Sequence, residues 1–229
     1  MSLAEYVDLT HEFRDGMPGF RMRDEDGTEI EYTAEISPFL THEETRPMYD
    51  GRASFEITEM TFQTAVGTYL DAPAHRFPGA RDVADLTLDE LVNDGVVVDV
   101  RGRDPYEAVD GSVLPDDADL AGAAVLFNFG WDTHWGTEAY REYPYVSEAL
   151  VDRLVDAGVA LVGVDTINAD DDRNPARPTH TKLLDAGVPV VENLRGLDAL
   201  HDRPFRFHAV PIRAVGAAAM PIRAYAELR

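Results

Sequence analysis

The hydrophobic residues of this chain gather in short runs that are separated by polar turns. Several runs are rich in β-branched residues and apolar at consecutive positions, which is typical of strands covered on both faces. We therefore expect a sheet with a buried centre. The predicted strands are Val96–Val100, Ala124–Phe129, Val159–Val164, Val188–Val191, Phe205–Val215 and Ile222–Tyr225.

Helical signals lie between these runs. Ser147 is a suitable N-cap for a helix whose apolar stripe runs through Leu150–Val155 and which Gly158 ends. Shorter helices are predicted at Leu86–Val92 and at Thr181–Ala186, each followed by a glycine that stops it. Strands and helices therefore alternate through the second half of the chain.

The first 60 residues carry a different pattern, in which apolar and polar residues alternate. The segment Glu56–Phe62 is an example, and such alternation is typical of antiparallel strands with one face in water. Antiparallel strands followed by alternating strands and helices indicate an α/β fold with a mixed β-sheet core and flanking helices. Because the chain contains no linker or internal repeat, we expect residues 1–229 to form a single domain.

Composition narrows the class of protein. No apolar run approaches the roughly 20 residues that a membrane-spanning helix needs, and Met1–Asp8 lacks the basic and apolar regions of a signal peptide. We therefore expect a cytoplasmic protein without a membrane partner. The chain has no cysteine, which excludes disulfides, thiolate metal sites and a cysteine nucleophile.

The charge balance is strongly acidic. The chain has 43 acidic and 20 basic residues, a formal net charge of −23, and Lys182 is its only lysine. Such a surface repels the phosphates of nucleic acids and anionic membranes, so neither is expected as a partner. The acidic residues are spread along the chain, which suggests adaptation to high salt, where screening removes the self-repulsion.

The segment with the clearest chemical content is Gly67-Thr-Tyr-Leu-Asp-Ala-Pro-Ala-His75. Asp71 and His75 are four residues apart, a spacing that lets a carboxylate and an imidazole meet where the chain turns. A carboxylate can bind a metal ion or orient a histidine, and histidine can transfer protons near neutral pH. From these residues alone, a catalytic pair and a pair of turn or capping groups both remain open.

The same segment resembles the signature of the cyclase family, which includes bacterial kynurenine formamidase and isatin hydrolase. That signature reads His-x-Gly-Thr-His-x-Asp-x-Pro-x-His, and Ala65 and Tyr69 stand here in place of its first two histidines. Further matches follow in the family's order along nearly the whole chain. They are Asp8–Pro18, Phe129–Asp132, Leu161–Asp165, His180, Glu192–Leu194 and Pro221–Ala226.

This resemblance implies the swivelling β/β/α fold of the family and a metal centre. It assigns Asp71, His180 and Glu192 to one metal site and gives His75 the role of general acid and base. A second metal site would need the two replaced histidines. Alanine has no side-chain donor and neutral tyrosine is a poor metal ligand, so we expect one divalent ion, zinc or manganese, or none.

Other candidate residues have both a functional and a structural interpretation. Tyr69 is expected either to donate a hydrogen bond to a developing oxyanion or to fill the space of a histidine and a metal ion. Thr68 and Trp131 are candidate substrate contacts, with loop shaping and packing as the alternatives. The acidic run Asp170–Asp172 resembles a cation site, but in so acidic a chain we interpret it as a solvated loop.

The resemblance implies a hydrolase that cleaves a C–N amide or a lactone bond of a small molecule, similar to an arylformamidase. The alternative is a catalytically inactive protein of the same fold that binds a ligand or serves in an assembly. Simultaneous replacement of two metal ligands, by Ala65 and Tyr69, is what such a loss would look like. The family also implies a homo-oligomer, either a dimer or a tetramer.

Overall fold

The computed structural model describes residues 4–114 and 119–229, which form two compact units. Unit 1 contains residues 4–11 and 68–229 apart from the gap, and unit 2 contains residues 12–67. The candidate site residues of the sequence analysis lie in unit 1, with the exception of Ala65.

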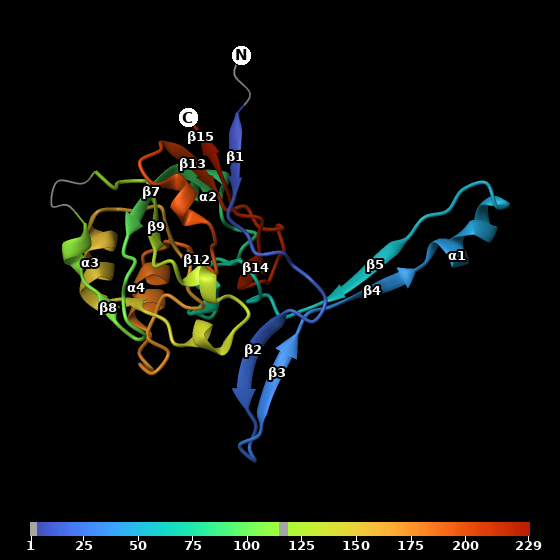
Figure 1. Cartoon of the computed structure of the whole chain (residues 1–229), viewed down its shortest axis with the longest axis horizontal. Helices are drawn as coiled ribbons and strands as arrows, with labels where there is room; N and C mark the ends of the chain where they lie inside the picture. The colour runs from blue at the N-terminus through green and yellow to red at the C-terminus, as the bar shows by residue number, and fades with distance from the viewer. Residues whose placement is uncertain (1–3, 115–118) are drawn as a thin grey trace. The chain divides into compact units, whose positions relative to one another are not determined.

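Unit 1 is built on one mixed sheet (Figure 1). Its parallel centre runs β7-β9-β11-β12, and the remaining strands are antiparallel to their neighbours. In spatial order, the strands of the described part are β1 (Glu5–Asp8), β15 (Tyr225–Leu228), β13 (Phe205–His208), β7 (Val92–Asp99), β9 (Ala124–Asn128), β11 (Leu161–Val164), β12 (Val190–Glu192), β6 (Tyr69–Asp71) and β14 (Ala219–Pro221).

Short helices and turns of 3₁₀-helix connect the strands of unit 1. The helices are α2 (Leu88–Leu91), α3 (Glu148–Asp156) and α4 (Pro178–Asp185), and β8 (Ala108–Val109) pairs with β10 (Tyr145–Val146). The 3₁₀-helices are η2 (Pro73–His75), η3 (Gly111–Val113), η4 (Trp131–His134), η5 (Glu138–Arg141) and η6 (Leu197–Leu200). Within the described ranges, no helix has the length and apolar character that crossing a bilayer requires.

The core lies between the parallel strands and the pair α3 and α4 (Figure 1). Val125 and Phe127 of β9 pack with Leu150 and Leu154 of α3, and all four side chains are fully buried. Burying such a side chain stabilises the fold by about 1.5–3 kcal/mol. Every residue of β9 and of β11 is buried, which confirms the prediction of strands covered on both faces.

Unit 2 consists of two antiparallel ribbons and a short helical tip. The elements are β2 (Pro18–Arg23) with β3 (Glu29–Thr33), β4 (Glu35–Leu40) with β5 (Ile57–Thr61), α1 (His42–Thr45) and η1 (Arg46–Tyr49). The alternating segment Glu56–Phe62 does form a strand, but the expectation of one buried face is wrong. All five residues of β5 are exposed, because within the described chain neither face of this ribbon is covered.

The C-terminal strands differ from their predicted extents. The run Phe205–Val215 is a strand only as far as His208. Pro211, which has no backbone N–H to donate, lies in the segment that follows, where Ile212 is 72% and Val215 90% exposed. The predicted strand Ile222–Tyr225 is also displaced, because β14 ends just before it, at Pro221, and β15 begins only at its last residue, Tyr225.

The helix predictions fare better than the strand ends. Ser147 caps α3 by accepting a hydrogen bond from the backbone N–H of Leu150, as predicted. The helix predicted at Thr181–Ala186 begins three residues earlier, at Pro178. A proline at the first helical position is favourable, since its missing N–H would have no intrahelical partner there.

Candidate active site

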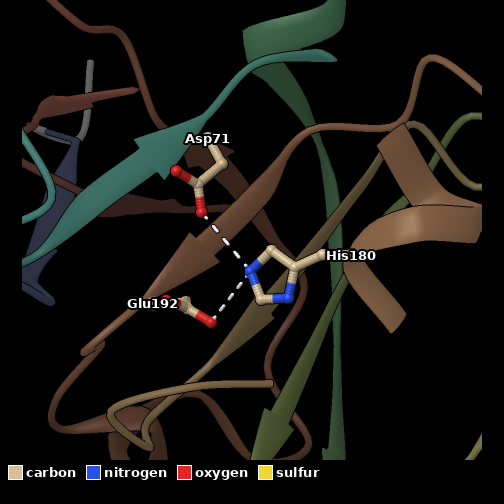
Figure 2. Close-up of side chains that lie close together, drawn as sticks. All are labelled: Asp71, His180 and Glu192. Carbon is tan, nitrogen blue, oxygen red and sulfur yellow. Dashed lines mark ion pairs between the residues drawn. The ribbon is translucent and has the colours of Figure 1, made fainter. Parts of the chain in front are cut away.

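Three buried side chains converge between β6, β12 and α4 (Figure 2). Nε2 of His180 lies 3.4 Å from Oδ2 of Asp71 and 3.2 Å from Oε1 of Glu192. One donor atom from each of these residues lies within 4.8 Å of the others. The structure thus brings together the three residues that the sequence analysis assigned to one metal site.

The sheet register explains this convergence. In the antiparallel pair β6–β12, Tyr69 lies opposite Glu192 and Asp71 lies opposite Val190. Because side chains alternate between the two faces of a strand, Tyr69, Asp71 and Glu192 point to the same face. His180, in the first turn of α4, reaches this face from the side (Figure 2).

The three side chains are desolvated and only partly satisfied. Asp71 and Glu192 are fully buried and His180 is 3% exposed. Both carboxylate oxygens of Asp71 and Nε2 of His180 lack a hydrogen-bond partner among the described residues. Burial raises the pKa of Asp71. Burial alone would lower the pKa of His180, but the charge of Glu192, and next the hydrogen bond between Nδ1 and Asp170, raise that pKa well above its usual value.

A third carboxylate, that of Asp170, orients His180 from the Nδ1 side of its ring. Its Oδ2 lies 2.7 Å from Nδ1 of His180 and accepts the backbone N–H of His180, and its Oδ1 accepts the N–H of Thr179. Asp170 therefore satisfies the start of α4 and favours the tautomer with its proton on Nδ1, which turns Nε2 toward Asp71 and Glu192. The interpretation of the run 170–172 as a solvated loop is wrong for Asp170, which is fully buried.

We expect Asp170→Asn to weaken zinc binding by about 10–100-fold, because His180 loses the carboxylate that fixes its ring and tautomer. A competition titration against a chromophoric zinc chelator measures this change. Asp171→Asn is the matched control, since the Asp171 carboxylate pairs with Arg173 at the surface. Equal zinc affinity in the two variants would show that Asp170 serves only to cap α4.

His75 lies at the mouth of this cluster. Its Nδ1 is 3.4 Å from Oδ1 of Asp71, its ring centroid is 5.9 Å from that of His180, and its side chain is 36% exposed. The turn η2 that carries it is tied to α4, because Arg76 donates a hydrogen bond to the hydroxyl of Thr181. A partly exposed imidazole beside a buried carboxylate can exchange protons with water or substrate.

The side chain of Tyr69 points toward the carboxylate of Glu192. Its hydroxyl donates a hydrogen bond to Oε2 of Glu192. Burial, and next the charge of Glu192, raise the pKa of Tyr69 well above its usual value, so the phenol stays protonated. In this arrangement its proton is already in use, so it is not free for a developing oxyanion.

The two candidate substrate contacts occupy different surroundings. Thr68 donates to the carbonyl oxygen of Asn193 at 2.6 Å and accepts the backbone N–H of His11 at 3.0 Å, so its hydroxyl joins three chain segments. Trp131 is part of the main hydrophobic core, and its buried indole nitrogen has no hydrogen-bond partner among the described residues. Their roles in binding substrate stay predictions.

The donor set fits a divalent metal ion. Asp71 and Glu192 supply carboxylate oxygens, His180 supplies an imidazole nitrogen, and three of the buried donor atoms have no competing hydrogen bond in the described structure. Three carboxylates, counting Asp170, surround this single histidine, and a divalent cation would supply the positive charge that they lack. Two carboxylates and one imidazole are suitable ligands for zinc or manganese.

The amino-acid sequence is similar to a known protein family and to known enzymes. The family model described as "Putative cyclase" matches residues 7–171. The kynurenine formamidase of Salinibacter ruber is 31% identical over 181 residues, which cover 76% of this chain and 81% of that protein. The kynurenine formamidase of Paracidovorax citrulli is 27% identical over 177 residues, covering 73% and 78% of the two chains.

Solved structures support the fold. Isatin hydrolase A from Ralstonia solanacearum is similar with a TM-score of 0.83 at 23% identity, covering 99% of this chain and 92% of that chain. An isatin hydrolase bound to the product analogue thioisatinate has a TM-score of 0.83 at 21% identity, covering 98% and 92%. These similarities confirm the mixed-sheet α/β fold that was expected.

Proposed function

Because this chain belongs to the cyclase family, we propose that it hydrolyses an amide or lactone bond of a small molecule, in the manner of an arylformamidase. The observation that carries this proposal is the convergence of Asp71, His180 and Glu192, with unpartnered donor atoms and with His75 beside them. The names of the relatives, kynurenine formamidase and isatin hydrolase, support a C–N amide substrate.

Asp71, His180 and Glu192 would hold one divalent ion, zinc or manganese. When bound, such an ion supplies Lewis acidity toward an acyl carbonyl and makes coordinated water more acidic. A second ion is not part of this proposal, because Ala65 and Tyr69 replace the two histidines that it would need.

His75 performs the proton transfers of the proposed reaction. With its Nδ1 proton facing Asp71, Nε2 is free to take a proton from the water that attacks the acyl carbon. The same imidazole then returns that proton to the departing nitrogen, so that the amide and water become a carboxylic acid and an amine. Asp71 steadies the positive charge that His75 carries between the two transfers.

The test uses protein purified without chelator or affinity tag, with metal analysis and a panel of aryl formamides, other acylamides and lactones. We expect about one ion per chain and turnover that a chelator removes and added zinc or manganese restores. No ion together with no turnover would overturn the proposal in favour of a protein that only binds ligands. Turnover without any ion would overturn the metal role. The inactive alternative is not favoured, because the late ligand pair and His75 are all in place.

Exposed apolar side chains on the β4–β5 ribbon and on the adjoining η1 support the proposal of a homo-oligomer, a dimer or tetramer. A two-stranded ribbon with both faces in water is marginally stable, and a second copy of the chain would cover it. Light scattering, which gives the mass in solution, tests this proposal. The exposed side chains are Phe39, Met48, Tyr49, Ile57 and Met60.

The remaining proposals concern the setting of the protein. We keep a cytoplasmic location, the absence of nucleic-acid and membrane partners, and one cyclase-like domain over residues 1–229 as predictions. Adaptation to high salt predicts a melting temperature that rises with added KCl, since screening reduces the repulsion within a chain of net charge −23. A melting temperature indifferent to KCl would reject that adaptation.

A further inference from the structure

Glu192 has two oxygens in different surroundings. Oε1 accepts the backbone N–H of Ala169 at 2.8 Å and lies 3.2 Å from Nε2 of His180. Oε2 accepts the hydroxyl proton of Tyr69. One oxygen therefore faces the donor cluster, and the other is held by a neutral phenol.

Tyr69 is placed for this contact by the sheet itself. It lies directly opposite Glu192 in the β6–β12 pair, and both side chains are buried. Neighbouring side chains on one face of such a pair are within easy reach of each other. The pairing of β6 with β12 therefore brings the two side chains together without the help of a loop.

We propose that Tyr69 is a positioning residue for the metal centre: its hydroxyl fixes Oε2 of Glu192, so that only Oε1 is presented to the metal. This inference rests on the proposed metal-dependent function and deepens it. Tyr69, which stands where the cyclase signature has a histidine ligand, therefore still acts on the proposed metal site, through Glu192.

The contact has a physical consequence for metal affinity. A buried carboxylate ligand keeps a fixed orientation when its other oxygen, the one that does not bind the metal, accepts a hydrogen bond. Loss of such a hydrogen-bond partner typically lowers metal affinity by about 10–100-fold. Without the hydroxyl, Oε2 of Glu192 would be buried without a partner, and only the contacts of Oε1 would hold the carboxylate. We therefore expect Tyr69→Phe to bind zinc about 10–100-fold more weakly than the original chain, still at one ion per chain.

Zinc affinity is measured by competition with a chromophoric chelator, and the number of ions by metal analysis. Tyr140→Phe is the matched control. Tyr140 is also buried and its hydroxyl donates to Oδ1 of Asn193 at 2.9 Å, so the control loses a buried hydroxyl that touches no ligand. Its zinc affinity is expected to stay within about twofold of the original chain, which is small against the loss expected from an outer partner.

Three results would overturn the inference. Unchanged or tighter zinc binding by Tyr69→Phe would show that the hydroxyl does not position Glu192, while one ion in the original chain would leave the proposed function standing. Two ions per original chain would contradict a single-ion centre in which Glu192 presents only Oε1. No ion in the original chain would overturn the proposed function as well. If Tyr69→Phe fails to fold, a zinc-bound crystal structure of the original chain decides, since ligation of the ion by both oxygens of Glu192 would contradict the proposal.

Discussion

Asp71→Asn is expected to abolish both metal binding and hydrolysis. The carboxylate of Asp71 offers two buried oxygens without a partner in the described structure, one toward His180 and one toward His75. An amide is a much weaker ligand than a carboxylate and cannot balance the charge of an ion or of a protonated His75. Metal analysis and turnover of the formamide panel measure the two losses.

Although Asp71→Asn should lose metal binding and turnover, the thermal stability of the metal-free protein should not fall. Burying a carboxylate without hydrogen bonds is costly, so the metal-free variant should melt no lower than the metal-free original chain. Added zinc should raise the melting temperature of the original chain and leave that of the variant unchanged. Asp89→Asn, at an exposed position of α2, is the control. Retention of both ion and turnover by Asp71→Asn would contradict the assigned role.

His75→Gln is expected to lower kcat by about 10²–10⁴-fold, the usual contribution of a positioned general acid and base. The metal content should stay at one ion per chain, because His75 contacts Asp71 through the oxygen that does not face His180. Steady-state kinetics and metal analysis on the same preparation separate the two effects. His42→Gln changes an exposed histidine of unit 2 and should leave kcat unchanged. Normal kcat in His75→Gln would remove it from the mechanism.

The sequence allowed the centre of the fold to be predicted better than its edges. The run Ala124–Phe129 is apolar at every position except Asn128 because its strand is buried on both faces, and that pattern is visible without a structure. The run Phe205–Val215 was also predicted to be one strand, yet the strand ends at His208 and the apolar side chains of Val210, Ile212 and Val215 are exposed. Hydrophobicity alone does not say whether another element covers an apolar segment.

The candidate site, too, was only partly predictable from the sequence. Asp71, His75, His180 and Glu192 were identified because they match a family signature, and the sheet register then explains why they meet. Asp170 was missed because its role depends on the start of α4 folding back over it. No local spacing reveals a carboxylate that accepts the N–H groups of a helix start nine and ten residues further on.

The tyrosine at position 69, where the signature has a histidine, was interpreted as the loss of a metal ligand, because a phenol is a poor ligand. Its contact with Glu192 is set by the pairing of β6 with β12, two strands far apart in the sequence. A side chain that no longer binds a metal can therefore still shape the carboxylate that does. Only the register of the sheet makes this visible.

The central claim is that one ion binds between Asp71, His180 and Glu192. Anomalous diffraction from crystals of the untagged protein grown with zinc, collected on both sides of the zinc absorption edge, tests it directly. We expect one anomalous peak per chain in contact with Oδ2 of Asp71, Nε2 of His180 and Oε1 of Glu192. Two peaks per chain, or none within reach of these atoms, would contradict it.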